Sequence, residues 1–359
     1  MTNVGFIGLP GSGKSTVFKA LTRQSVAPQF LGHDLKPHQA VVKIPDERLD
    51  WLTQMYQSRA KVEATLEVVD LPGFDPATTE RKLLNSVLEH YRKSDALALV
   101  LNLFDAEEAK KAAAGLQAIL DELVLLGMIT AENCAKRLEK AAAHKANQEA
   151  AEKYKALIKV KEQLEEGIPV RRMELEEADK RILREYAFIS EKPVIVVLNV
   201  ADDDLAKSDS EIEGMEACLA IAKAEGLTTV RIAAALQAEL STMEDDEAEE
   251  YMAEFGIAER ALAKLIRASH EALGLITFLT GSEKECRAWS LRRGANAQQA
   301  AGVIHTDMSR GFIRAETVGY GDLTAAGDFN AAKAAGKVRL EGKEYIVKDG
   351  DILSIRFNV

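Results

Sequence analysis

Cysteine is scarce in this sequence. The 359 residues contain three cysteines, an odd number, at the widely spaced positions Cys134, Cys218 and Cys286. Neither a disulfide framework nor a zinc site fits this spacing, because both need cysteines in pairs or short clusters. We therefore expect a protein of a reducing compartment, located in the cytoplasm.

Targeting segments, long apolar runs and an excess of positive charge are also missing. No apolar run approaches the ~20 residues that span a bilayer, and no basic and apolar leader with a cleavage site stands at the N-terminus, so we expect no membrane partner. The 46 Lys and Arg residues face 57 Asp and Glu residues, which gives a formal net charge of -11. The whole molecule therefore repels nucleic acid at long range, and any RNA contact must be local.

What remains is ordinary material for a folded protein. Hydrophobic residues make up 47% of the chain and charged residues 29%, which excludes wholesale disorder. At about 150 residues per domain, a chain of 359 residues predicts two or three domains.

A phosphate-binding loop stands near the N-terminus. Residues 8–15 fit the pattern G-x-x-x-x-G-K-[ST], after the apolar run at residues 4–7 and before a helix expected from Ser15 to about Leu21. Glycines let backbone N–H groups turn toward an anion, and the helix adds the positive end of its dipole. The alternative is a glycine-rich turn without a ligand. The predicted nucleotide-binding residues here are Pro10, Gly11, Ser12, Gly13, Lys14, Ser15 and Thr16.

A second pattern follows the strand expected at residues 64–69. Asp70 and Gly73 form a D-x-x-G at the end of this strand, for which the alternative is a simple turn. We expect Lys14 to reach the β and γ phosphates and Gly73 to offer its N–H to the γ-phosphate, which makes these two the predicted catalytic residues. We expect Ser15 and Asp70 to hold Mg²⁺.

The next apolar segments predict buried central strands at residues 96–103 and 193–198, as a parallel sheet requires. Between them, residues 106–188 are rich in Ala, Glu, Lys and Leu. An uninterrupted tract at residues 131–166 predicts a helix of ~54 Å, and its sparse apolar stripe indicates an antiparallel helical hairpin inserted into the sheet domain. A solvated support without a partner is the alternative.

Directly after the strand at residues 193–198 come Asn199, Val200 and Asp202. They stand where nucleotide-binding proteins of the translation-factor type read the base with N-K-x-D, although Val200 replaces the lysine. A helix at residues 214–225, a strand at residues 228–232 and an acidic helical stretch at residues 239–254 continue the α/β alternation.

From about residue 273 the pattern changes to short strands with turn signals, which predicts a separate small α+β domain. The expected strands are residues 276–280, 286–290, 312–318, 343–347 and 352–357. This segment carries 12 Lys and Arg against 10 Asp and Glu, whereas the rest of the chain carries 34 against 47. It is therefore the part of the surface that repels RNA least.

The C-terminal segments Ala300–Asp307, Gly311–Glu316 and Gly336–Tyr345 closely resemble the TGS domain, a ubiquitin-like β-grasp, of the YchF or Obg-like ATPase family. Shorter matches to that family are Pro45–Leu49, Glu165–Gly167 and Gln237–Leu240. The resemblance spans nearly the whole chain. It implies a P-loop NTPase domain of the G type (residues 1–105 and 190–272), an inserted α-helical coiled-coil arm (residues 106–189) and a TGS domain (residues 273–359).

The resemblance also implies slow nucleotide hydrolysis, a preference for ATP over GTP, and association with the ribosome or a ribosomal subunit, with RNA contact through the TGS domain and the helical arm. The chain departs from the family at several places. No Thr lies between Arg23 and Val41 to close the first switch, and Phe74 stands in the place of the water-orienting Gln of Ras-type enzymes, where the family also carries a hydrophobic residue. At the second base-contacting loop the family's Ser-Ala pair is replaced by two alanines, which leaves the backbone N–H of Ala234.

Base choice is where these departures matter. In the family the fourth residue of the base-reading tetrapeptide is typically Glu and the base is adenine, whereas Asp202 is the residue that guanine recognition requires. We expect ATP, with GTP as the alternative, because the resemblance covers the whole chain. The sequence thus predicts a Mg²⁺-dependent nucleotide-binding protein with slow ATP hydrolysis that acts as a ribosome-associated switch. The alternatives are a nucleotide-gated binding module that no longer hydrolyses and a P-loop kinase.

Overall fold

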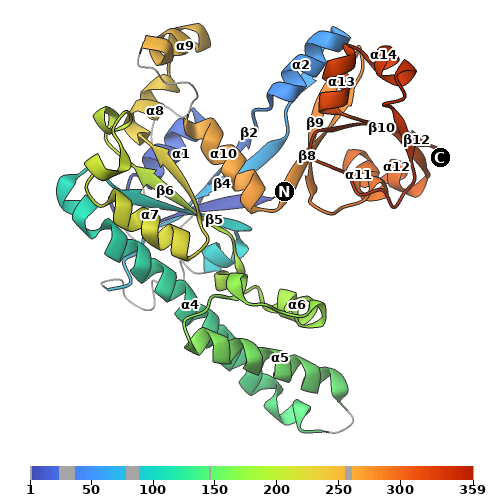
Figure 1. Cartoon of the computed structure of the whole chain (residues 1–359). Coiled ribbons are helices and arrows are strands. Elements are labelled where there is room, and N and C mark those ends of the chain that lie inside the picture. Colours follow the sequence, from blue (N-terminus) through green and yellow to red (C-terminus); the bar gives the residue numbers. More distant parts are fainter. Residues whose placement is uncertain (1, 24–36, 78–88, 145–146, 255–260, 359) are drawn as a thin grey trace. The chain divides into compact units, whose positions relative to one another are not determined.

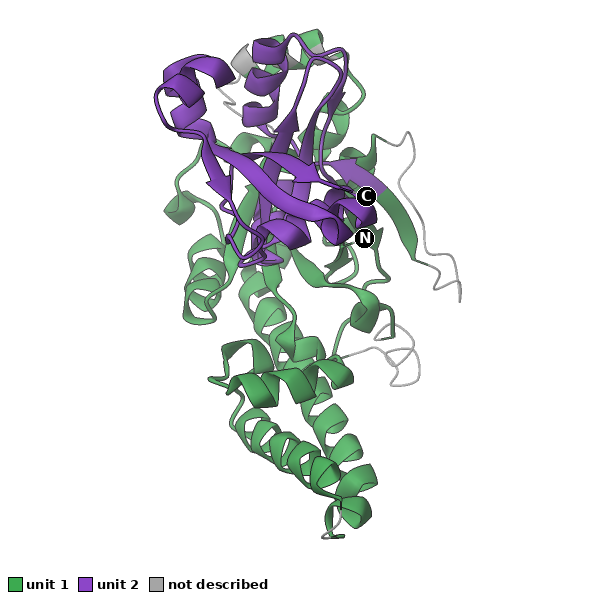
Figure 2. Ribbon diagram, turned by 90° about the vertical axis from the view of Figure 1, so that its right-hand side faces the viewer, with its two compact units in different colours: residues 1–40, 67–265 green, residues 41–66, 266–359 purple. Residues whose placement is uncertain are grey.

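The computed structural model describes residues 2–23, 37–77, 89–144, 147–254 and 261–358, and its contacts group the chain into two compact units. Unit 1 consists of residues 1–40 and 67–265, and unit 2 of residues 41–66 and 266–359 (Figure 2). The helical residues 106–189 group with unit 1. The segment 41–66 lies in the sequence between the two predicted phosphate-contacting patterns, yet it groups with the C-terminal residues. The three-part domain division remains a prediction.

The first of two six-stranded sheets has the order β2-β4-β1-β5-β6-β7 (Figure 1). Its strands are β1 (Asn3–Ile7), β2 (His38–Lys43), β4 (Thr65–Asp70), β5 (Ala96–Asn102), β6 (Val194–Asn199) and β7 (Thr228–Ile232). β1 runs parallel to β4 and β5, and β6 runs parallel to β5 and β7. The carboxyl ends of these strands therefore meet at one edge, where α/β proteins bind their ligands. The strands predicted from apolar runs are confirmed.

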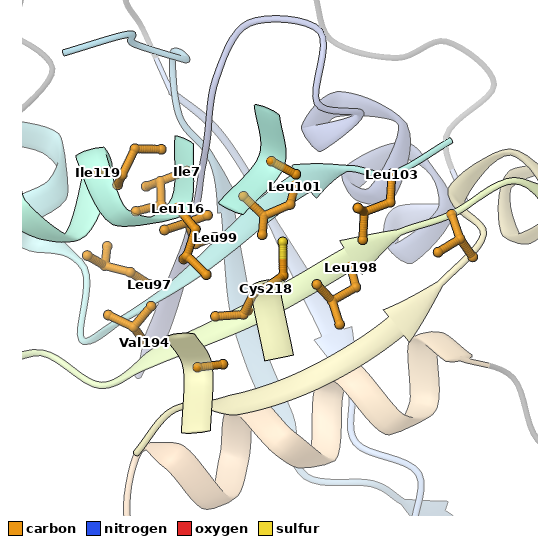
Figure 3. Close-up of a cluster of buried hydrophobic side chains, with 14 of the residues drawn as sticks. Ile7, Leu97, Leu99, Leu101, Leu103, Leu116, Ile119, Val194, Leu198 and Cys218 are labelled. Carbon is orange, nitrogen blue, oxygen red and sulfur yellow. The ribbon is translucent and has the colours of Figure 1, made fainter. Parts of the chain in front are cut away.

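Helices cover this sheet because its central strands are apolar on both faces. They are α1 (Lys14–Thr22), α4 (Ala106–Ala142), α7 (Met215–Ala224), α8 (Ala234–Leu240) and α9 (Asp245–Glu254). Figure 3 shows Leu116 and Ile119 of α4 and Cys218 of α7 packed against side chains of β5 and β6. The acidic stretch predicted as one helix at residues 239–254 is wrong in its bounds, since α8 ends at Leu240 and α9 begins at Asp245.

The inserted helices differ from the prediction in their bounds. The expected straight helix at residues 131–166 is wrong: α4 ends at Ala142 and α5 (Gln148–Glu165) begins after Asn147, whose side chain accepts a hydrogen bond from the N–H of Ala150 (3.2 Å). The two helices fold back on each other and bury an apolar stripe that a single straight helix would expose to water. The stripe comprises Ala131, Ala135, Leu157, Val160 and Leu164. Short helices complete the insertion: η1 (Val170–Arg172), α6 (Glu177–Leu183), η2 (Arg184–Tyr186) and η3 (Ile189–Glu191).

By length and composition alone, α4 is apolar enough to cross a membrane. Its buried residues lie in two protein core clusters, one against the sheet and one against α5. One such helix is weak evidence for a membrane span, because the core helix of a folded protein has the same composition.

The second sheet has the order β11-β10-β12-β8-β9-β3. Its strands are β3 (Lys61–Val62), β8 (Leu275–Gly281), β9 (Cys286–Arg292), β10 (Phe312–Gly319), β11 (Arg339–Glu341) and β12 (Asp351–Phe357). The helices grouped with this sheet are α2 (Glu47–Tyr56), α11 (Ala297–Ile304), α12 (Thr306–Arg310), α13 (Tyr320–Ala326) and α14 (Phe329–Ala334). In the sequence, α10 (Ala261–Ala272) begins in unit 1 and ends in unit 2. The strand predicted at residues 343–347 is wrong. That segment turns and forms only an isolated bridge from Ile346 to Asn296, and the edge strand is β11.

Residues 41–66 are bound into unit 2 by both strand pairing and charge. β3 pairs with β9, and Arg48 donates hydrogen bonds to Asp46 (2.7 Å) and to Asp349 (2.6 Å). The Asp349 carboxylate also accepts a hydrogen bond from the N–H of Thr277 (2.8 Å). These partners keep the pKa of Asp349 below its ordinary value despite its burial, so the pair stays charged at neutral pH.

Candidate nucleotide site

The loop at residues 8–15 follows β1 and turns into α1 through three glycines with positive φ. These are Gly8 (φ +148°), Gly11 (φ +77°) and Gly13 (φ +91°). A Cβ on Gly8 would lie 2.4 Å from the carbonyl oxygen of Val100, and one on Gly13 would lie 2.3 Å from Nδ2 of Asn199. Glycine is therefore required at both positions. No side chain of the described residues caps the first turn of α1, so its N–H groups suit an anion.

Lys14 is buried at the centre of this loop. Its side chain is only 6% exposed, and its Nζ donates a hydrogen bond to the carbonyl oxygen of Leu9 (3.0 Å). Burial lowers the pKa of Lys14 to about 8, although the nearby charge of Asp70 acts in the opposite direction. A bound phosphate would place a negative charge beside this amine and so favour its protonated form.

Ser15 and Asp70 meet beside this lysine. The Ser15 hydroxyl donates a hydrogen bond of 2.8 Å to Oδ2 of Asp70. Asp70 is fully buried, and its Oδ1 has no hydrogen-bond partner among the described residues. Burial raises the pKa of Asp70, while the hydrogen bond from Ser15 and the charge of Lys14 lower it.

This pair fits a magnesium ion. A buried carboxylate oxygen without a partner and a neighbouring hydroxyl are oxygen donors of the kind that Mg²⁺ prefers. Within the described part of the chain, no group of three or more His, Cys, Asp or Glu residues could hold a metal by itself. The arrangement therefore suits Mg²⁺ bound by one or two side chains together with phosphate oxygens, rather than a complete protein cage.

Gly73 lies against the phosphate-binding loop. A Cβ at this position would come within 2.6 Å of Nζ of Lys14 and 3.0 Å of the carbonyl oxygen of Gly8. The D-x-x-G turn thus lies directly against the loop, with Gly73 beside the lysine. The predicted contact of its N–H with a γ-phosphate is compatible with this placement and stays a prediction.

Asn199 ties the loop to the predicted base-reading segment. Its Nδ2 donates to the carbonyl oxygen of Ser12 (3.1 Å), and its Oδ1 accepts from the N–H of Ala234 (3.0 Å). On the neighbouring strand, Asn102 stands in register with Asn199 and donates to the carbonyl oxygen of Gly11 (3.4 Å). Asn102 was not among the predicted site residues, although its position at the end of an apolar strand was an available signal.

The other predicted base-contacting residues differ in exposure. The side chain of Val200 is 2% exposed and belongs to the core, so only its backbone is left to face a ligand. Asp202 is exposed at the start of the short helix η4 (Asp202–Asp204). Ser12 is buried with no hydrogen-bond partner for its hydroxyl among the described residues, whereas Pro10 and Gly11 are exposed and Thr16 is half-buried.

Two aromatic residues near the loop have opposite environments. Phe104 is 45% exposed, and its ring lies 3.8 Å from where a Cβ on Gly13 would be. The sequence analysis missed this exposed ring, which offers an apolar face beside the loop. Phe74, in the place of a water-orienting Gln, is fully buried and packs its ring against Tyr91. Most of the segment between Arg23 and Val41, where the missing Thr was noted, lies outside the described residues.

Known proteins are similar to this chain over nearly its whole length. Residues 3–133 match a family model described as "50S ribosome-binding GTPase", and residues 275–358 match one described as "Protein of unknown function (DUF933)". The chain is 36% identical to the "Ribosome-binding ATPase YchF" of Bacillus subtilis (strain 168), with 99% of both chains covered. It is also 36% identical to "Obg-like ATPase 1" of Oryza sativa subsp. japonica, over 99% of this chain and 92% of the relative. The solved structure of the Schizosaccharomyces pombe YchF GTPase matches with a TM-score of 0.84 at 30% identity, over 99% and 97% of the two chains.

The Asn199 bridge predicts unequal effects for two similar substitutions. Asn199→Ala leaves two buried backbone groups without partners, at about 1–3 kcal/mol each. Asn102→Ala removes two exposed hydrogen bonds, one donated to the carbonyl oxygen of Gly11 (3.4 Å) and one accepted from the N–H of Asp105 (3.1 Å), whose backbone groups water can reach. We expect Asn199→Ala to weaken nucleotide binding at least tenfold and Asn102→Ala less than threefold. Calorimetric titration of both purified variants measures this. Equal losses of affinity would contradict the bridging role of Asn199.

The pKa of Lys14 predicts proton uptake on nucleotide binding. At a pKa of about 8, about a quarter of Lys14 is neutral at pH 7.5 and about three quarters at pH 8.5. Because phosphate favours the charged amine, binding raises this pKa, and the number of protons taken up should increase by about half a proton between the two pH values. Titration calorimetry in buffers of different ionisation enthalpy measures the uptake. A value that is equal at both pH values, or that falls, would refute this view of Lys14.

Proposed function

The chain belongs to the YchF and Obg-like ATPase family, with a P-loop GTPase-like α/β fold, and on this basis we propose that it is a Mg²⁺-dependent NTPase with slow ATP hydrolysis that acts as a ribosome-associated switch. One observation carries the catalytic part of this proposal. Lys14, Ser15, Asp70 and Gly73 come from two segments 55 residues apart and converge at one edge of the sheet. Phosphoryl transfer needs mainly this kind of positioning and charge stabilisation.

Ser15 and Asp70 would hold the metal ion, which supplies neutralisation of the negative charge on the phosphates. The chain's own groups do the rest. In this proposal the N–H groups at the start of α1 bind phosphate oxygens, Lys14 places a positive charge beside them, and Gly73, which lies next to Lys14, donates its N–H to the γ-phosphate. Asn199 holds the conformation of the phosphate-binding loop through its hydrogen bond to the carbonyl oxygen of Ser12.

The proposed slow turnover is supported by what the site lacks among its described residues. Phe74 is buried against Tyr91, so it cannot orient a water molecule. Without a polar side chain in that place, the attacking water must be positioned by other groups. We propose that a partner changes this arrangement when it binds.

The proposed base is adenine. Asp202 is exposed at the position where guanine recognition places a carboxylate, but the lysine that packs beneath a guanine in N-K-x-D proteins is replaced by the buried Val200. Phe104 offers an exposed apolar ring near Gly13 that suits stacking on either purine. Relatives carry both designations, ATPase in Bacillus subtilis and GTPase in Schizosaccharomyces pombe.

The proposed partner is the ribosome or one of its subunits, in the cytoplasm. The support is the printed name of the Bacillus subtilis relative, which describes that protein as ribosome-binding. We propose that α4 and α5 form a coiled-coil arm and that residues 273–359 form a TGS domain of the β-grasp type. RNA contact would then go through these two parts.

The buried Phe74 also favours a second candidate, a nucleotide-gated binding module that no longer hydrolyses. Phosphate release by the full-length chain, with and without ribosomes, separates the two. We expect slow release with Mg²⁺-ATP, a severalfold increase with ribosomes, and loss of at least a hundredfold in Lys14→Ala, because the variant removes the cation at the centre of the loop. Nucleotide binding without release, with or without ribosomes, would favour the module and overturn the NTPase proposal.

Base preference gives a separate prediction. Competition of ATP and GTP for the wild-type chain should favour ATP, and Asp202→Glu should leave that preference unchanged or increase it. Asp203→Glu is the matched control, because Asp203 is the next residue and is equally exposed. Tenfold tighter binding of GTP by the wild-type chain, about 1.4 kcal/mol, would show that the base assignment is wrong.

A further inference from the structure

Tyr91 is a fully buried tyrosine whose hydroxyl donates a hydrogen bond to a backbone carbonyl close to the nucleotide site. Its Oη donates a hydrogen bond to the carbonyl oxygen of Pro72 (3.1 Å). Its ring packs on that of Phe74, with centroids 5.6 Å apart. A phenylalanine would fill the same space, so the hydroxyl needs a reason other than packing.

The carbonyl of Pro72 and the N–H of Gly73 belong to the same peptide group. In a planar trans peptide these two groups point in opposite directions, so a hydrogen bond that fixes the carbonyl also fixes the direction of the N–H. Gly73 itself lies against the phosphate-binding loop, since a Cβ on it would lie 2.6 Å from Nζ of Lys14 and 3.0 Å from the carbonyl oxygen of Gly8. Tyr91 thus holds a peptide group that lies beside this loop.

We propose that Tyr91 is a positioning residue that aims the Gly73 N–H at the third phosphate and so sets the preference of the site for a triphosphate over a diphosphate. This inference rests on the proposed function, in which the loop at residues 8–15 binds a nucleoside triphosphate. The hydrogen bond also polarises the peptide, which makes its N–H a stronger donor. No sequence pattern marks Tyr91, because its role depends on a contact between residues 19 positions apart.

The test compares Tyr91→Phe with the wild-type chain. The variant keeps the ring beside Phe74 and removes only the hydroxyl. We expect affinity for a non-hydrolysable, fluorescently labelled ATP analogue to fall about fivefold, in the range of one lost hydrogen bond. Affinity for the labelled diphosphate should change less than twofold, because a diphosphate has no third phosphate for Gly73 to contact.

Tyr345→Phe is the matched control. It removes another hydroxyl, one that donates to Asp351 (2.8 Å) and accepts from Arg339 (3.0 Å) in unit 2, and it should change neither affinity. Thermal unfolding without nucleotide checks that the variants are folded. If Tyr91→Phe does not fold, Tyr91→Met fills most of the same volume without a hydroxyl and should show the same selective loss.

An equal loss of affinity for both nucleotides, or no loss for either, would overturn the inference, because a purely structural role does not separate them. If the wild-type chain binds triphosphate and diphosphate equally well, the Gly73 N–H makes no useful contact with the third phosphate. That result would also overturn the inference. A wild-type chain that binds neither nucleotide identifies a failure of the proposed function itself. Lys14→Ala is the reference for that outcome, because this variant should bind neither the triphosphate nor the diphosphate.

Discussion

The pair of hydrogen bonds made by Asn199 is the interaction on which the site depends. One side chain at the end of β6 fixes the Ser12 carbonyl in the phosphate-binding loop and the Ala234 N–H at the start of α8. These three segments are far apart in the sequence, and the parallel sheet brings their ends to one edge. The absence of a side chain on Gly13 lets Asn199 approach so closely. The shape of the cradle is therefore a property of the sheet as much as of the loop.

Burial of charge prepares the same site for a ligand. Lys14 and Asp70 are both buried. Burial lowers the pKa of Lys14 and raises the pKa of Asp70, so it favours the neutral form of each side chain. Ser15 satisfies one oxygen of Asp70 and leaves the other without a partner. A metal ion would pair with Asp70 and a phosphate with Lys14. Because folding has already removed these two side chains from water, their desolvation adds less to the free energy of ligand binding.

Much of the fold could be predicted because its determinants are local. Continuous apolar runs indicated β5 and β6, and the glycine spacing located the cradle at residues 8–15. The bounds of the inserted helices were not predicted, because Ala, Glu and Lys favour helix on both sides of the break before Asn147. The false strand at residues 343–347 has the alternation of a strand but forms only one bridge.

The site was less predictable where residues act through tertiary contacts. Phe104 and Tyr91 have no pattern of their own, and Asn102 is marked only by its place at the end of an apolar strand. Each matters because of what the fold places beside it. The membership of residues 41–66 in unit 2 is of the same kind, since it rests on the pairing of β3 with β9 and on the Arg48 and Asp349 pair. Local composition carries no information about partners more than 200 residues away.

The most direct test is a crystal structure of the chain with Mg²⁺ and a non-hydrolysable ATP analogue. The account predicts the phosphates on the N–H groups of residues 10–15, the metal held by Ser15 with Asp70 as a direct or water-mediated ligand, and Gly73 N–H within hydrogen-bond distance of the γ-phosphate. Asn199 should keep both of its hydrogen bonds. A triphosphate bound away from this loop, or bound there with Ser15 still donating to Asp70 and no metal beside them, would contradict it.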